Sequence, residues 1–255
     1  MKDKALGMMN VVLRKVEQSQ AWAQLCQSCF GKDLSQYNMA GMDQLDLMIE
    51  RLEINEKDKV LDLGCGVGKI AEYISDVTGC EMLGIDITQN IIEKANTRTI
   101  NKRNRLNYQV LDFNQLSDFS LKFNKIIAID SLYFVKKTDP FIQQLTSLLL
   151  PAGMIGIVQN DFFESSLDAT KRVLTKTKLA TSFQQNNFDL DILDLTPQLA
   201  HLWEKQIKAV DDLDELFLAE GNFDLYLNWL NEVMHIKKQI AENRISRLFY
   251  KGVSK

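Results

Sequence analysis

The sequence predicts an α/β fold: a doubly wound, mainly parallel sheet of seven strands flanked by helices. Two observations support this prediction. From residue 59 onward, short apolar runs alternate with helical patterns, and these runs are apolar throughout rather than at every second position. Alternation of this kind is typical of a parallel sheet covered by helices, whose strands are buried on both faces.

Apolar spacing and turn residues place each element in order. Helices are expected at 8–28, 42–52, 68–77, 89–98, 138–150, 165–180, 196–219 and from 222 to 243. Strands are expected at 59–63, 82–85, 108–111, 126–129, 154–158, 188–195 and 245–253. Gly79 and Pro151 are expected to end their helices, and the Thr196-Pro197 pair to begin one.

The composition excludes several classes of protein. The 255 residues are 45% hydrophobic and 25% charged, which is ordinary for a soluble globular protein. The formal net charge of −4 gives no general attraction for nucleic acid or anionic lipid. No apolar run approaches the ~20 residues of a membrane helix, and the first residues lack the apolar segment of a signal peptide. We therefore expect a cytoplasmic protein with no nucleic-acid or membrane partner, either a monomer or a homodimer.

Cysteine and histidine are too sparse for most metal sites. Cys26 and Cys29 form one CxxC pair with no second pair or neighbouring histidine, and they fall within a helical pattern. A single pair of this kind is a weak signal for zinc. His201 and His235 are the only histidines, so catalysis by a metal held by several histidines is excluded. No metal is expected.

A glycine-rich turn carries the functional signal. The strand at 59–63 runs into Gly64, Gly66 and Gly68, and a helix follows at once. Glycine allows a sharp turn and a close approach of the backbone to a ligand, and a helix start favours a negative group. Asp86 ends the next apolar run, where a carboxylate can accept hydrogen bonds from a ribose diol. This order of elements predicts a nucleoside site.

The spacing of the glycines distinguishes two kinds of nucleoside site. Dinucleotide sites prefer G-x-G-x-x-G, but the last position of that pattern is Lys69 here. Asp62 also stands two residues before the first glycine. The segment 62–68 resembles the first motif of the class I S-adenosylmethionine-dependent methyltransferases, which have a Rossmann-like fold. The resemblance covers residues 40–160 well and the late strands more loosely. It implies S-adenosylmethionine as cofactor and S-adenosylhomocysteine as product.

The resemblance also implies a set of cofactor-binding residues. By analogy, Asp86 holds the ribose with Ile87 beside the adenine, and Asp112 lies near the adenine amino group next to Phe113. The expected set is Tyr37, Asp62, Gly64, Cys65, Gly66, Gly68, Asp86, Ile87, Asp112, Phe113 and Asp130. Plainer alternatives stay open: Asp112 could cap a turn before Asn114, Phe113 could belong to the core, and Cys65 could be selected for its small size.

The same resemblance suggests the layout of the chain. Residues 1–55 would form N-terminal helices that act as a lid, and 56–195 the cofactor-binding core. Residues 196–243 would be a helical cap inserted before the final strand of the core at 244–255, all within one compact domain. Candidates for catalysis are Tyr133, His201 and His235, and candidates for substrate binding are Tyr133, Phe134, Asp161, Phe162, Trp203 and Trp229.

The acceptor is predicted to be a small molecule, with an amine nitrogen favoured. Base-amino methyltransferases carry an Asn/Asp-Pro-Pro-aromatic tetrad after the fourth strand, whereas residues 130–133 contain no proline. An amine needs only to lose a proton to water, so it requires no strong base. O- or C-methylation stays open, as do a nicotinamide-dependent oxidoreductase and a non-catalytic nucleoside-binding module. A magnesium site at Asp130, Asn160 and Asp161 is the weaker alternative to a metal-free site.

Overall fold

A computed structural model describes residues 2–117, 119–163 and 174–255. The chain forms two compact units. The first, the helical unit, comprises Met1–Leu45, Asn160–Lys171 and Asp194–Arg247. The second, the sheet unit, comprises Asp46–Gln159, Arg172–Leu193 and Leu248–Lys255. Both units are therefore assembled from segments that lie far apart in the sequence.

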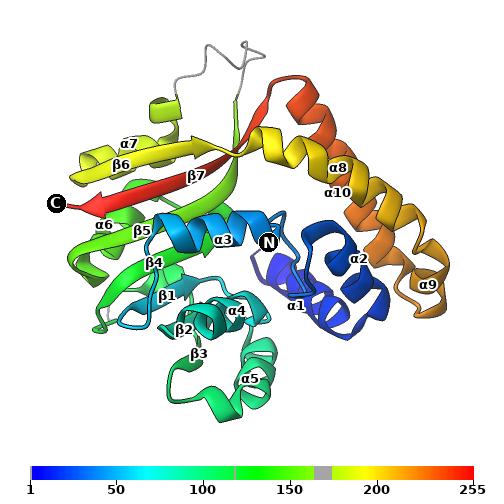
Figure 1. The fold of residues 1–255 in the computed structure, drawn as a ribbon, viewed down its shortest axis with the longest axis horizontal. Helices are drawn as coiled ribbons and strands as arrows, with labels where there is room; N and C mark the ends of the chain where they lie inside the picture. Colours follow the sequence, from blue (N-terminus) through cyan, green and yellow to red (C-terminus); the bar gives the residue numbers. More distant parts are fainter. Residues whose placement is uncertain (1, 118, 164–173) are drawn as a thin grey trace. The chain divides into compact units, whose positions relative to one another are not determined.

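A seven-stranded sheet has the order β3-β2-β1-β4-β5-β7-β6 (Figure 1). The strands are β1 (Lys59–Leu63), β2 (Glu81–Asp86), β3 (Leu106–Val110), β4 (Phe123–Ile129), β5 (Leu149–Phe162), β6 (Phe188–Asp194) and β7 (Ile245–Ser254). The pairs β1–β2, β2–β3, β1–β4 and β4–β5 are parallel. The order reverses between β1 and β4, and ligands of open α/β sheets bind at such a switch point. The expected doubly wound fold is confirmed.

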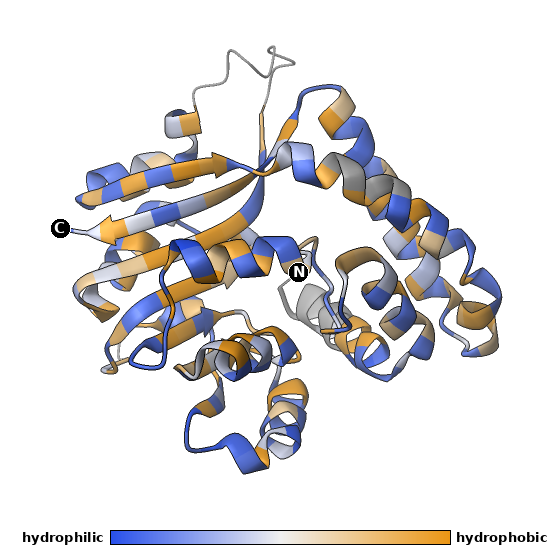
Figure 2. Cartoon of the chain, viewed as in Figure 1, coloured by the Kyte–Doolittle hydropathy of each residue, from blue (hydrophilic) through white to orange (hydrophobic). Residues whose placement is uncertain are grey.

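Helices of the sheet unit connect its strands. They are α4 (Lys69–Thr78), α5 (Gln89–Arg98), α6 (Thr138–Leu148) and α7 (Lys178–Gln185). Gly68 and Gly79 flank α4 in left-handed conformations, so α4 ends at the glycine predicted to end it. The core of this unit includes Phe123, Ile126 and Leu145, and Figure 2 shows hydrophobic residues along the central strands.

The helical unit has a core of its own. Its helices are α1 (Lys2–Gln18), α2 (Gln20–Phe30), α8 (Thr196–Asp211), α9 (Asp214–Ala219) and α10 (Phe223–Ala241), and α3 (Met42–Arg51) leads from this unit into the other. The rings of Trp22 and Trp229 meet edge to face with centroids 5.1 Å apart. Glu220 accepts hydrogen bonds from the Ser19 hydroxyl and from the backbone N–H groups of Gln20 and Ala21, over 2.5, 2.8 and 3.0 Å.

Several expected boundaries are wrong. The helix expected at 8–28 is two helices, because Ser19 has an extended backbone and its hydroxyl caps α2 through the Trp22 N–H. The helix expected at 196–219 is divided between α8 and α9. β5 begins at Leu149, five residues before the expected strand, and α6 ends at Leu148. Most of the helix expected at 165–180 lies outside the described residues; in the part that is described, α7 begins only at Lys178 and continues to Gln185.

No helix within the described residues combines the length and the apolar character that crossing a bilayer requires.

Candidate functional site

The glycine turn between β1 and α4 is wound tightly against the end of β2. Gly64, Gly66 and Gly68 have φ angles of +75°, +52° and +76°. Residues other than glycine rarely adopt such angles. The backbone N–H groups of Gly64 and Cys65 both donate to the carbonyl oxygen of Ile85, over 2.8 and 3.0 Å. The turn is therefore fixed to the strand that carries Asp86.

Asp86 joins this turn to the start of α5. Its Oδ2 accepts a hydrogen bond of 3.0 Å from the Gly66 N–H, and its Oδ1 accepts one of 2.9 Å from the Thr88 N–H. A carboxylate oxygen has two lone pairs, so each oxygen keeps acceptor capacity for a further donor. The carboxylate is thus oriented by the backbone and able to accept hydroxyl groups of a ligand.

Two neighbouring side chains occupy the space that a Cβ on the turn would need. A Cβ on Gly64 would lie 2.6 Å from the Cβ of Ser131, and a Cβ on Gly68 would lie 2.5 Å from a ring carbon of Tyr108. Ser131 also donates a hydrogen bond of 2.6 Å to the carbonyl oxygen of Leu63. The end of β4 and the ring from β3 therefore hold the turn on two sides, and both contacts require glycine.

Asp62, two residues before Gly64, is buried. The residue is only 4% exposed. Burial, reinforced by the negative charge of Asp86, raises the pKa of its carboxyl from the usual 3.8 to about 7. Burial likewise raises the pKa of the Cys65 thiol, and a Cβ on Gly84 would lie 2.8 Å from its sulfur. The Cys65 side chain therefore fills space against Gly84 of β2, and its selection for small size stays a prediction.

Asp112 and Phe113 make the contacts expected of a turn cap and of a core residue. Asp112 Oδ1 accepts hydrogen bonds from the backbone N–H and the side-chain amide of Asn114, over 2.9 and 3.0 Å. Phe113 is buried, and its ring lies 5.8 Å from that of Phe141 in the core. Ile87, in contrast, is exposed beside Asp86. Contact of these residues with adenine stays a prediction.

An aspartate with a strained backbone follows β4. Asp130 has a φ of +50°, a conformation that costs energy in a residue with a side chain. The Tyr133 hydroxyl lies 3.1 Å from Asp130 Oδ1 and donates to it. The Tyr133 and Phe134 side chains are 48% and 58% exposed. One short turn therefore presents a carboxylate and two aromatic rings.

The remaining candidates lie in the helical unit. The ring centroid of Tyr37 lies 5.5 Å from that of Trp22 and 5.9 Å from that of Trp229. Trp229 itself is 1% exposed and belongs to the core. Burial, followed by the charge of Glu232, raises the pKa of Tyr37 to about 12. Asp161 and Phe162 end β5, and His235 is exposed on α10. The backbones of His201 and Trp203 belong to α8, but their side chains lie outside the described part of the chain.

The methyltransferase domain family matches residues 54–246. The chain belongs to this family. The prediction of a class I S-adenosylmethionine-dependent methyltransferase is thereby confirmed, and members of the family use that cofactor. The match includes the glycine turn, Asp86, Asp130 and the helices from α8 to α10, but it begins after the first three helices.

Individual methyltransferases resemble parts of this chain. Methyltransferase GfsG of Streptomyces halstedii is 30% identical over 120 residues, 46% of this chain and 43% of that protein. Sterol 24-C-methyltransferase of Candida albicans is 26% identical over 131 residues, 49% and 35% of the two chains. Phosphoethanolamine N-methyltransferase 2 of Haemonchus contortus, solved with phosphomonomethylethanolamine and S-adenosylhomocysteine, shares the fold with a TM-score of 0.76 at 17% identity, over 95% of this chain and 60% of that one. The matches thus span less than half of the two curated relatives.

Two contacts of the glycine turn could not be predicted from the sequence. Arg98 Nη2 donates to the carbonyl oxygen of Val67 over 2.8 Å, and the Tyr108 hydroxyl donates to that of Gly68 over 2.6 Å. In the sequence, Arg98 is an ordinary charged residue at the end of an expected helix. Tyr108 is an aromatic residue in an expected strand. Neither the spacing nor the residue type marks them as neighbours of the turn.

No group of three or more metal-binding side chains occurs among the residues that the structure describes.

Proposed function

We propose that this protein transfers the methyl group of S-adenosylmethionine to a small-molecule acceptor, with an amine nitrogen as the favoured site. The observation that carries the proposal is the glycine turn bound to Asp86 through the Gly66 N–H. A tight turn without Cβ atoms, next to an oriented carboxylate, suits the ribose of an adenosyl group. Membership of the methyltransferase domain family supports the same cofactor.

The residues of the turn fit S-adenosylmethionine as a ligand. Asp86 would accept hydrogen bonds from the ribose hydroxyl groups, and Ile87, exposed beside it, would contact the adenine. Asp130 would place negative charge near a cationic ligand. When bound, the cofactor supplies an activated methyl group on a sulfonium. The chain therefore needs mainly to align the acceptor and exclude water.

The turn after β4 supports an amine acceptor. Asp130 carries a negative charge that Tyr133 orients, and the faces of Tyr133 and Phe134 are accessible to a cationic group. An amine reaches its nucleophilic form by losing a proton to water, so its methylation requires no strong base. Tyr133, His201 and His235 are proposed as the groups that contact or deprotonate the acceptor. Asp161, Phe162, Trp203 and Trp229 are proposed to line its binding site.

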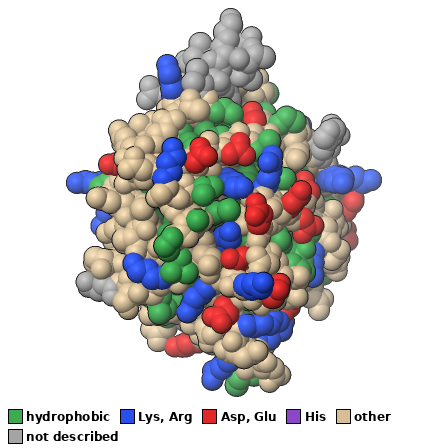
Figure 3. All heavy atoms as spheres, turned by 60° about the vertical axis from the view of Figure 1, so that its left-hand side comes forward, with side chains coloured by type: hydrophobic (Ala, Val, Ile, Leu, Met, Phe, Trp, Pro, Cys, Tyr) green, Lys and Arg blue, Asp and Glu red, His purple; other side chains and the backbone are tan. Residues whose placement is uncertain are grey.

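The formal net charge of −4 favours a small molecule over a polyanion as the acceptor. Figure 3 shows Lys and Arg side chains interspersed with Asp and Glu on the face that it presents. That face has no uniform sign, whereas phosphate backbones are bound by clustered positive charge. Transfer to carbon is the second candidate, because the chain resembles a sterol 24-C-methyltransferase over 131 residues.

The proposal can be tested with defined ligands and a mixed pool of metabolites. The protein is first titrated with S-adenosylhomocysteine and, separately, with NADH, and thermal stabilisation is measured. Stabilisation by the first ligand alone is expected, since a ligand that binds the folded state raises its stability. The protein is then incubated with S-adenosylmethionine and the pool, and mass spectrometry follows products heavier by one CH2. Stabilisation by NADH alone would support an oxidoreductase, and binding without any product would support a non-catalytic module.

A further inference from the structure

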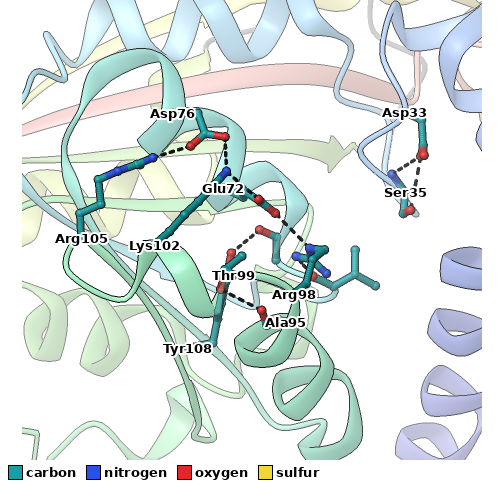
Figure 4. Close-up of polar contacts among 12 residues, drawn as sticks. Asp33, Ser35, Glu72, Asp76, Ala95, Arg98, Thr99, Lys102, Arg105 and Tyr108 are labelled. Carbon is teal, nitrogen blue, oxygen red and sulfur yellow. Dashed lines mark hydrogen bonds and ion pairs between the residues drawn. The ribbon is translucent and has the colours of Figure 1, made fainter.

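Two side chains hold adjacent carbonyl groups of the glycine turn. Arg98, at the end of α5, donates to the carbonyl oxygen of Val67, and Tyr108, in β3, donates to that of Gly68 (Figure 4). The two bonds measure 2.8 and 2.6 Å. Both residues follow the turn in the chain by about one βα unit. They therefore bind it through tertiary contacts.

Arg98 is itself fixed by a network of ion pairs. Its Nε lies 3.0 Å from a carboxylate oxygen of Glu72 in α4. Glu72 also pairs with Lys102 at 2.8 Å, and Lys102 pairs with Asp76 at 2.6 Å, as Figure 4 shows. Charged networks with several partners hold their members more firmly than isolated surface pairs do. The guanidinium group is therefore directed toward the turn.

Tyr108 is buried against the same turn. A Cβ on Gly68 or on Gly84 would lie within 2.7 Å of its ring, so the ring contacts both backbones closely. Burial raises the pKa of the phenol, which keeps the hydroxyl protonated and able to donate. The hydroxyl therefore stays available to donate to the Gly68 carbonyl at neutral pH.

We propose that Arg98 and Tyr108 are positioning residues that keep the glycine turn in its cofactor-binding conformation. The inference rests on the proposed function, since it assumes that the turn binds S-adenosylmethionine. A turn with three glycines has many accessible backbone conformations, and each conformation that cannot bind lowers the apparent affinity. The two hydrogen bonds reduce that freedom before the cofactor arrives. Neither residue takes part in methyl transfer itself.

Matched variants separate this role from a general effect on stability. Tyr108→Phe removes only the hydroxyl, and Arg98→Gln removes the guanidinium group that bonds to Val67. Arg105→Gln is the control: Arg105 pairs with Asp76 at 2.5 Å and also donates to Ser75, and among the described residues its side chain makes no hydrogen bond to the glycine turn. Arg98→Lys keeps a cation with fewer donors and should restore part of any loss.

The expected result is a selective loss of cofactor affinity. Isothermal titration with S-adenosylhomocysteine should show Kd raised about three- to tenfold in Tyr108→Phe and Arg98→Gln, the effect of one hydrogen bond. Arg105→Gln should stay within about twofold of the parent protein. Once the acceptor is known, KM for the cofactor should rise while kcat is retained. The N–H groups of Gly66 and Gly68 should also exchange hydrogen faster in the two affected variants without ligand.

The outcomes distinguish failure of this inference from failure of the proposed function. If the parent protein binds S-adenosylhomocysteine and both variants bind it equally well, Arg98 and Tyr108 do not position the turn. Equal losses in Arg98→Gln and Arg105→Gln would also overturn the inference, because they would indicate general destabilisation. If the parent protein binds neither S-adenosylhomocysteine nor S-adenosylmethionine, the proposed function itself is wrong.

Discussion

The carboxylate of Asp86 accepts a hydrogen bond from the backbone N–H of Gly66, with 3.0 Å between Oδ2 and N. Its other oxygen is bound by the Thr88 N–H at 2.9 Å. One side chain thus connects the glycine turn with the start of α5. The same oxygens are proposed to bind the ribose. Removing the carboxylate therefore removes both the contact with the ligand and the hydrogen bonds that hold the glycine turn and the start of α5 together.

Asp86→Ala is therefore expected to abolish binding of S-adenosylhomocysteine, and Asp86→Asn, which keeps one acceptor oxygen, to weaken it less. Isothermal titration measures both effects. Glu81→Ala is a suitable control, because Glu81 begins the same strand and its side chain is 61% exposed. Unchanged binding by Asp86→Ala would disprove the ribose assignment.

Gly68→Ala tests whether the turn requires glycine for space as well as for conformation. Gly68 and Gly221 both have positive φ angles, +76° and +69°, which cost an alanine ~1–2 kcal/mol. A Cβ at Gly221 meets nothing within 4 Å, whereas one at Gly68 meets the Tyr108 ring. Gly68→Ala should therefore lower the free energy of unfolding more than Gly221→Ala does, and it alone should abolish cofactor binding. Urea denaturation and titration measure the two effects, and equal losses of stability would contradict the close packing.

Asp62 should make stability depend on pH. Its folded-state pKa of about 7 lies above the usual 3.8, so the folded protein binds more protons than the unfolded chain between these values. The free energy of unfolding should then fall as the pH rises through this interval, by an amount on the order of a few kcal/mol. Asp62→Asn, which stays uncharged, should flatten the curve and raise Tm at pH 7.5. Thermal scans from pH 4.5 to 7.5 measure Tm for both proteins. If Tm depends on pH in the same way in the parent protein and in Asp62→Asn, Asp62 does not cause the pH dependence.

Tyr133→Phe should affect the acceptor and leave the cofactor unaffected. The change removes the hydroxyl that donates to Asp130 but keeps the exposed ring. We expect KM for the acceptor to rise about three- to tenfold, the loss of one hydrogen bond, with Kd for S-adenosylhomocysteine unchanged. Phe134→Leu, which removes an exposed aromatic face, is the companion variant. A loss of cofactor affinity in Tyr133→Phe would place Tyr133 at the cofactor instead.

Trp229→Ala should destabilise the protein by ~3–5 kcal/mol, because it removes a large buried ring from the core of the helical unit. Leu227→Ala, on the same helix but 44% exposed, should change stability by less than about 0.5 kcal/mol. Chemical denaturation measures both values. Trp229→Phe keeps much of the packing, so a large rise in the acceptor KM with a small loss of stability would support contact with substrate. Mild effects of Trp229→Phe on both measurements would indicate that Trp229 has a packing role that phenylalanine can fill, and would argue against contact with substrate.

The regular part of the fold was predictable because it follows from local patterns. Apolar runs gave the strands, and Gly79 gave the end of α4, since a left-handed glycine ends a helix without help from distant residues. The break at Ser19 was missed for the opposite reason. The apolar spacing continues across it, and the Ser19 hydroxyl is bound to Glu220, whose position relative to Ser19 depends on the complete fold.

The candidate site divides in the same way. Glycine spacing and the acid after the second strand predicted the turn and Asp86, because those residues are linked by short-range geometry. Arg98 and Tyr108 were missed, since only folding places them beside the carbonyls of Val67 and Gly68. Trp229 shows the remaining difficulty: an aromatic residue at helical spacing gives no sign of whether it packs in a core or contacts a ligand.

The bonds from Ser19, Gln20 and Ala21 to Glu220 have a consequence for how the chain is made. Ribosomes add roughly 5–20 residues each second. The first two helices are therefore synthesised roughly 10–40 s before their carboxylate partner. Meanwhile Trp22 and its apolar neighbours lack the residues of α8 to α10 that cover them in the folded protein, so this segment exposes apolar surface during synthesis.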